Sequence, residues 1–192
     1  MTIDDRKVDI DDELNEFECE ILTKIQNRRT QFTNYFWKFW TFFGSPYIWI
    51  ILCGIFIVMK MFHVSYTIFV IFISYFVIVL PLKSLIRRKR PYASCKDVKA
   101  LDTMLRDFSF PSGHTFLGTI SFFSFALIYG NIFWIVLSLI LGGFVGFSRI
   151  YLGVHYITDV IISYFLAIFF AFLILWLSPT LYLMHELTIK LI

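Results

Sequence analysis

The sequence predicts an all-α fold: a polytopic membrane bundle of about five transmembrane helices, preceded by an N-terminal helix at the membrane interface. Of the 192 residues, 58% are hydrophobic and 16% are charged, whereas soluble domains have about 45–50% apolar and about 25% charged residues. A bilayer core about 30 Å thick needs roughly 20 apolar residues in a helix, and four uncharged runs contain 21 to 41 residues. This composition argues against a soluble globular domain.

The first 44 residues divide into two segments of different character. Residues 1–20 contain nine of the fourteen acidic residues and few apolar anchors, which predicts a solvated, disordered tail. Residues 21–44 include an aromatic stretch interrupted by Lys38, which is typical of an amphipathic interfacial segment with Trp37 and Trp40 at headgroup depth. An additional membrane span over residues 31–44 is the alternative, and it would invert the topology.

The remaining residues, 45–192, form the predicted membrane-embedded domain. The uncharged run between Asp107 and Arg149 is long enough for two helices, and a turn at residues 129–131 divides it. Together with the other three runs, it predicts spans near residues 45–61, 64–82, 114–129, 131–149 and 160–178.

Charge sets the predicted orientation. Five spans place residues 1–44, 83–113 and 149–159 on one side, together with fifteen of the seventeen Lys and Arg residues. Only Lys60 and Lys190 lie opposite. Because cytosolic loops carry the excess of basic residues, this side is predicted to face the cytosol.

The cysteines predict neither a disulfide nor a metal site. Cys19, Cys53 and Cys95 are widely separated and match no disulfide framework or zinc-ligand spacing.

Three polar clusters interrupt the apolar sequence, and five spans would bring all of them to one membrane face. Residues 83–91 are basic, and this cluster alone would favour a stop-transfer signal or an anionic-lipid patch over a catalytic role. Residues 108–114 combine a helix-breaking proline with a glycine, which favours a helix N-terminus that binds phosphate, although a simple turn is the alternative. In residues 149–159, His155 and Asp159 are four apart and can share a helix face, for chemistry or for a plain hydrogen bond.

These clusters resemble, in order and spacing, the three-part signature of the type 2 phosphatidic acid phosphatase superfamily. This superfamily includes lipid phosphate phosphatases and vanadium haloperoxidases. The matched motifs cover residues 83–159, about 40% of the chain, and they read Lys83-x6-Arg90-Pro91, Pro111-Ser112-Gly113-His114 and Ser148-Arg149-x5-His155-x3-Asp159.

The resemblance implies a role for each matched position. His155 would be the nucleophile that forms a phosphohistidine, Asp159 its orienting partner, and His114 the general acid and then the base. No cofactor or metal is expected, because fixed cations can stabilise phosphoryl oxygens. The implied phosphate-binding residues are Lys83, Arg90, Ser112, Gly113 and Arg149. The intervening Arg87, Arg88 and Lys89 are assigned to topology or lipid headgroups.

Within the superfamily, the chain looks most like polyisoprenoid diphosphate phosphatases, the group that includes presqualene diphosphate phosphatase. The implied enzyme is an integral membrane phosphohydrolase of the endoplasmic reticulum or nuclear envelope that takes its lipid phosphate or diphosphate from the bilayer and binds no nucleic acid. The alternatives are a phosphatidic acid phosphatase of glycerolipid metabolism, a lipid phosphotransferase, and a catalytically inactive membrane scaffold.

Overall fold

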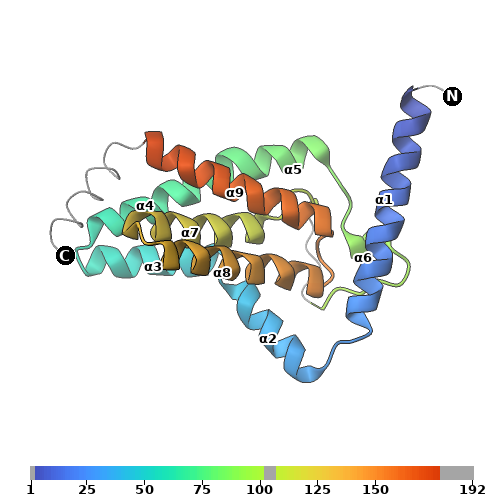
Figure 1. Ribbon diagram of the computed structural model, residues 1–192, viewed down its shortest axis with the longest axis horizontal. Helices are drawn as coiled ribbons and strands as arrows, with labels where there is room; N and C mark the ends of the chain where they lie inside the picture. Colours follow the sequence, from blue (N-terminus) through green and yellow to red (C-terminus); the bar gives the residue numbers. More distant parts are fainter. Residues whose placement is uncertain (1–2, 102–106, 178–192) are drawn as a thin grey trace.

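The computed structural model describes residues 3–101 and 107–177, and within these ranges the chain is helical without any strand (Figure 1). The predicted all-α membrane fold is confirmed. The elements in chain order are α1 (Ile3–Gln26), α2 (Gln31–Phe42), α3 (Pro46–Val58), α4 (Phe62–Ser74), the π-helical turn η1 (Tyr75–Val79), α5 (Leu80–Ile86), α6 (Pro91–Ser94), α7 (Gly113–Tyr129), α8 (Ile132–Tyr151) and α9 (Ile157–Leu177).

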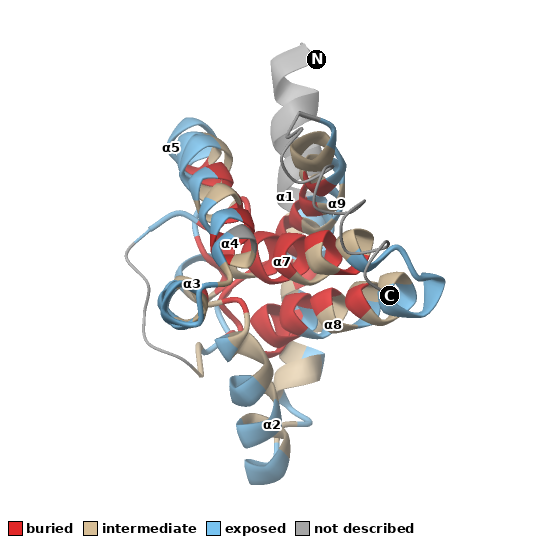
Figure 2. Cartoon of the chain, turned by 90° about the vertical axis from the view of Figure 1, so that its left-hand side faces the viewer, coloured by how far each residue is buried: buried red, intermediate tan, exposed pale blue. Residues whose placement is uncertain are grey.

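Helix α7 is the core of the bundle and packs against both α8 and α9 (Figure 2). Its side chains Phe116, Leu117 and Ile120 are fully buried. Close packing depends on small residues: a Cβ added to Gly142 of α8 would lie 3.1 Å from the Thr119 Cα of α7. Because α7 is buried along its length, the rest of the bundle fixes the position of its N-terminus.

The helix boundaries follow from local capping. The Asn131 side chain accepts the Phe133 N–H at 2.8 Å and starts α8. The preceding Gly130 ends α7 in the left-handed conformation, with φ 65°, which glycine adopts without a Cβ clash. The turn predicted at residues 129–131 is therefore present.

The membrane-crossing helices correspond to the predicted apolar ranges, and within the described residues three of them, or up to four, have the length and composition of a membrane span. By length and composition, three helical segments can cross a membrane: Val64–Ser94, Ile132–Tyr151 and Ile157–Trp176. A fourth span results if α2 and α3, bent by 51°, count as one. Helix α7 is apolar but shorter, with 17 residues.

The range predicted as one interfacial segment, residues 21–44, is divided in the structure. It contains the end of α1 and the separate helix α2, which Thr30 caps and which projects from the bundle (Figure 1). The α2 side chains Phe32 and Tyr35 are exposed, whereas the Trp37 ring packs on Phe147 of α8 with centroids 4.6 Å apart.

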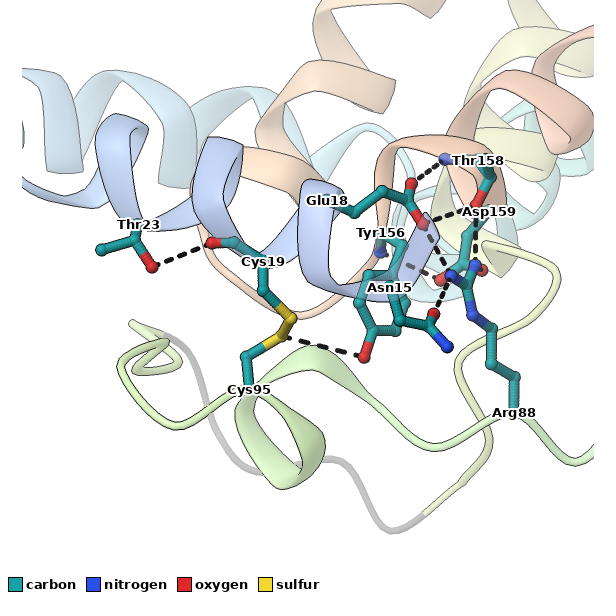
Figure 3. Close-up of a disulfide and its surroundings, with 9 residues drawn as sticks. All are labelled: Asn15, Glu18, Cys19, Thr23, Arg88, Cys95, Tyr156, Thr158 and Asp159. Carbon is teal, nitrogen blue, oxygen red and sulfur yellow. Dashed lines mark hydrogen bonds and ion pairs between the residues drawn. A yellow bond between two sulfur atoms is a disulfide. The ribbon is translucent and has the colours of Figure 1, made fainter. Parts of the chain in front are cut away.

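The N-terminal helix corrects two predictions. Residues 3–20 belong to α1 rather than to a disordered tail, and Cys19 forms a disulfide with Cys95 although the spacing suggested none (Figure 3). Leu22 is buried in a cluster with Ile150 and Tyr156. Glu18 is 2% exposed and accepts hydrogen bonds from the Thr158 N–H and hydroxyl. These partners are distant in sequence, so the local acidic composition gave no sign of them.

Candidate active site

Three buried cations line a cavity of about 310 Å³ at one end of the bundle. Lys83 lies on α5, Arg90 precedes α6, and Arg149 lies in the last turn of α8; their exposed fractions are 5%, 3% and 1%. The Arg149 guanidinium donates to the Thr41 hydroxyl of α2 at 2.5 Å. The cavity is lined by Gly44, Ser45, Pro46, Tyr47, Tyr75, Lys83, Arg90, Asp107, Gly113, His114, Arg149 and His155.

Asp107 occupies the donors of two of these cations. Its carboxylate lies 3.0 Å from Lys83 Nζ and 2.5 Å from Arg90 Nη2. Burial raises the pKa of this carboxyl, but the two cations outweigh burial and hold the pKa below its usual value. Asp107 is therefore ionised at neutral pH and sits where an anion would bind.

The orientation of the His155 ring follows from its two neighbours. Arg90 Nη1 lies 3.1 Å from Nε2 of His155, and Asp159 Oδ2 lies 3.4 Å from Nδ1. Because arginine can only donate, Nε2 must be the acceptor nitrogen, and the ring proton is then on Nδ1, towards Asp159. Burial lowers the pKa of His155 to about 3 against the opposing effect of Asp159, so the ring is neutral.

Asp159 is fully buried and shares its two oxygens among several donors. Oδ2 accepts the Ser109 hydroxyl and, at 3.0 Å, the Tyr156 N–H, in addition to facing His155. Oδ1 pairs with Arg88 at 2.7 Å. Ser109 and Arg88 come from the connections on either side of α6, so two loops hold this carboxylate.

The N-terminus of α7 contributes Gly113 and His114 to the cavity, but Ser112 does not line it. The Ser112 hydroxyl is fully buried and instead caps α7, accepting the Thr115 hydroxyl at 2.8 Å. Gly113 is tightly enclosed, because an added Cβ would lie 2.8 Å from the Tyr75 ring. Tyr75 is the first residue of the π-helical turn η1, a distortion that often occurs at functional sites.

The structure thus brings together seven of the eight residues assigned from the motifs, either on the cavity wall or directly behind it, and turns the Ser112 hydroxyl away. Sequence reasoning missed Asp107, Tyr75 and Arg88. Asp107 stands directly before the second cluster, and an acid beside a set of expected cations was a usable signal. Arg88 lies inside the first cluster, where neighbouring basic residues hid its role.

Among the described residues, no group of three or more acidic, histidine or cysteine side chains could hold a metal ion. The polar chemistry of the cavity instead comes from the cations and the two histidines described above.

A second cavity, about 430 Å³ and almost wholly apolar, lies between α3 and α4. Residues near the ends of these helices line the cationic cavity: Tyr47 lies in the first turn of α3, and Tyr75 directly follows α4. Helix α3 therefore contributes residues to both cavities. The apolar cavity is lined by Trp49, Ile50, Cys53, Gly54, Ile57, Ile68, Phe69 and Phe72.

Comparison with curated proteins gives two relatives. Undecaprenyl-diphosphatase of Sulfolobus acidocaldarius is 26% identical over 165 residues, covering 85% of this chain and 80% of that protein. Bacitracin transport permease protein BcrC of Bacillus licheniformis is 36% identical over 97 residues, covering 50% of this chain and 47% of that protein.

Solved structures share the fold. The transmembrane PAP2-type phosphatidylglycerolphosphate phosphatase of Bacillus subtilis superposes with a TM-score of 0.71 at 21% identity, covering 86% of this chain and 88% of that one. LpxE of Aquifex aeolicus gives a TM-score of 0.63 at 24% identity, covering 80% and 92%. The family model for the PAP2 superfamily matches residues 63–182, a range that includes all three polar clusters. The chain therefore belongs to the PAP2 superfamily of membrane phosphatases.

Proposed function

We propose that this protein hydrolyses isoprenoid diphosphates through a phosphohistidine on His155. The observation that carries the proposal is the position of His155: its ring lines the cavity, and its unprotonated Nε2 lies 3.1 Å from Arg90 Nη1. A nucleophile directly beside a phosphate-binding guanidinium is placed where a phosphorus atom would be held.

In the first half of the reaction, Arg90 turns its N–H from Nε2 to a phosphoryl oxygen, which frees the Nε2 lone pair. Nε2 then attacks the terminal phosphorus, and the bond from that phosphorus to the bridging oxygen breaks. Positive charge develops on the imidazole, and Asp159 stabilises it through the Nδ1–H. Lys83, Arg90 and Arg149 stabilise the charge on the phosphoryl oxygens, with the Gly113 N–H as a further donor at the start of α7. His114, on the same cavity wall, protonates the departing oxygen.

In the second half, the same His114 accepts a proton from water as the water oxygen attacks the phosphohistidine. The N–P bond breaks, inorganic phosphate leaves, and His155 returns to its neutral form. Phosphoryl transfer depends mainly on positioning and charge stabilisation, and three fixed cations supply both here. We therefore propose that turnover requires no metal. The capping role of the Ser112 hydroxyl leaves this residue a supporting function at the α7 terminus.

The apolar cavity between α3 and α4 supports a substrate with a long hydrocarbon tail. Helix α3 lines both this cavity and the cationic one, so a lipid whose diphosphate lies at His155 would find an apolar surface for its tail along Trp49 and Phe72. One relative is named an undecaprenyl-diphosphatase, which favours an isoprenoid over a glycerolipid. The excess of basic residues on the catalytic side supports a site that faces the cytosol, in the endoplasmic reticulum or nuclear envelope.

The test is phosphate release by the detergent-purified chain in EDTA from farnesyl diphosphate, farnesyl phosphate and phosphatidic acid at equal concentrations. His155→Ala serves as the control. Histidine-dependent release that is fastest from the diphosphate is expected. Preference for phosphatidic acid would reassign the substrate to glycerolipids, and phosphate transfer to an added alcohol would indicate a phosphotransferase. Equal release by wild type and His155→Ala would contradict the mechanism.

A further inference from the structure

Arg88 forms a bridge between two buried carboxylates from opposite ends of the chain. Its Nη1 lies 2.7 Å from Asp159 Oδ1, and its Nη2 lies 2.6 Å from Glu18 Oε2. The Arg88 side chain is 19% exposed, whereas Glu18 and Asp159 are 2% and 0% exposed. Hydrogen-bonded ion pairs with so little solvent on the carboxylates hold their geometry far better than surface pairs do.

Further contacts fix both ends of this bridge (Figure 3). Glu18 also accepts the Thr158 N–H at 2.7 Å, which anchors α1 to the first turn of α9. The Arg88 guanidinium lies over the Tyr156 ring, 3.8 Å from its centroid. Tyr156 and Thr158 both lie between His155 and Asp159 in sequence, so Arg88 and Glu18 contact the segment that follows the proposed nucleophile.

The two carboxylate oxygens of Asp159 have different partners, which indicates the role of the Arg88 bridge. Arg88 takes Oδ1, which leaves Oδ2 directed towards His155 Nδ1 and the Tyr156 N–H. Without Arg88, the carboxylate would lose a charge-assisted hydrogen bond in a buried site, and only the Ser109 and Tyr156 contacts on Oδ2 would oppose its rotation. The orientation of the His155 ring depends on this carboxylate, so loss of the Arg88 bridge would disturb the orientation of the proposed nucleophile.

We propose that Arg88 is a positioning residue for the Asp159–His155 pair, and that Glu18 of the N-terminal helix holds Arg88 in place. This inference rests on the proposed function of His155. Arg88 lies outside the set of described residues that line the catalytic cavity, so it acts through Asp159 and not on the substrate. Helix α1, although remote in sequence from the motifs, is then a working part of the active enzyme.

The disulfide gives the bridge a second attachment. Cys19 follows Glu18 directly and is joined to Cys95 at the end of α6, and the Tyr156 hydroxyl lies 3.9 Å from the Cys95 sulfur. Helix α1 is thus held by a covalent link to Cys95 at Cys19 and by hydrogen bonds from α9 to the adjacent Glu18 carboxylate. Displacement of α1 would remove Glu18 from Arg88.

The experiment compares Arg88→Ala, Arg88→Lys and Glu18→Gln in the purified full chain, with Lys96→Ala and Glu16→Gln as matched exposed controls. Arg88→Ala should lower kcat by about 10- to 100-fold with KM within about 3-fold, since orientation and not binding is lost. Arg88→Lys should recover part of kcat, and added guanidinium should partly rescue Arg88→Ala. Glu18→Gln should lower kcat less, by about 3- to 10-fold. The controls should match wild type.

A second arm separates positioning from simple stabilisation. In an Asp159→Asn background, adding Arg88→Ala should lower kcat by less than about 3-fold further, because residues that act through one another are non-additive. Thermal unfolding of each variant checks that the chain remains folded. Full additivity, or unchanged kcat in a folded Arg88→Ala protein, would overturn the positioning role alone. Equal activity of wild type and His155→Ala would instead overturn the proposed function.

Discussion

Asp107 should act as a built-in competitor of the phosphate group, and Asp107→Asn tests this. The carboxylate pairs with Lys83 and Arg90, whose N–H groups bind the phosphoryl oxygens in the proposed mechanism. Before a phosphate can bind, both ion pairs must break. The Asn side chain keeps the size of Asp107 but removes its charge, so phosphate should bind more tightly.

The structure sets the size of the effect. The Asp107 side chain is 50% exposed, so each pair is weakened by solvent to about 0.2–1 kcal/mol. Two pairs then correspond to about 0.4–2 kcal/mol, or about 2- to 30-fold tighter binding. The assay is the competitive inhibition constant of inorganic phosphate, with the exposed Asp97→Asn as control. An unchanged or weaker inhibition constant for Asp107→Asn would mean that the carboxylate organises the two cations for substrate and does not compete with it.

Three further predictions concern the reacting groups. The pKa of His155 is lowered to about 3 in the folded protein, so the folded ring stays neutral while the unfolded one protonates below about 6.5. The free energy of unfolding should therefore fall as the pH falls from 6.5 towards 3. Thermal unfolding measures this fall, which should be smaller in the inactive but folded His155→Ala protein. Arg90→Lys should lower kcat/KM by about 10-fold or more in phosphate-release assays, because lysine cannot reproduce the guanidinium contacts to His155 and the phosphate. In Gly44→Ala, the new Cβ would meet the His114 carbonyl oxygen at 2.6 Å, so the same assay should show about 10-fold lower kcat, whereas Gly143→Ala, with open space around it, should match wild type.

The sequence predicted the membrane helices and the grouping of the motif side chains around one cavity, because both leave local signals. Uncharged runs mark helices such as α8 and α9 directly, and the motif spacing placed His155 and Asp159 within reach of each other. The span count was less secure, since α7 is apolar throughout yet has only 17 residues and is buried by its neighbours.

The features that the sequence did not reveal depend on contacts between distant segments. Glu18 looks like one more acid in a charged tail until Thr158, 140 residues away, binds it. The Ser112 hydroxyl was assigned to phosphate binding, and its hydrogen bonds from the Thr115 N–H and hydroxyl show instead that it caps α7. Asp107 likewise gains its meaning from the cations that surround it.

The redox state of Cys19 and Cys95 indicates which compartment this end of the protein faces. Disulfides persist in oxidising compartments and are reduced by glutathione in the cytosol, and this one lies with α1 and α6 beside the Glu18–Thr158 contact, at the His155 end of α9. A catalytic face in the cytosol, as the basic residues favour, would carry two thiols on backbones 5.7 Å apart at Cα, and α1 would then be held by its non-covalent contacts. Labelling the thiols in intact and permeabilised cells would therefore reveal both the compartment of the catalytic face and how firmly its N-terminal helix is fastened there.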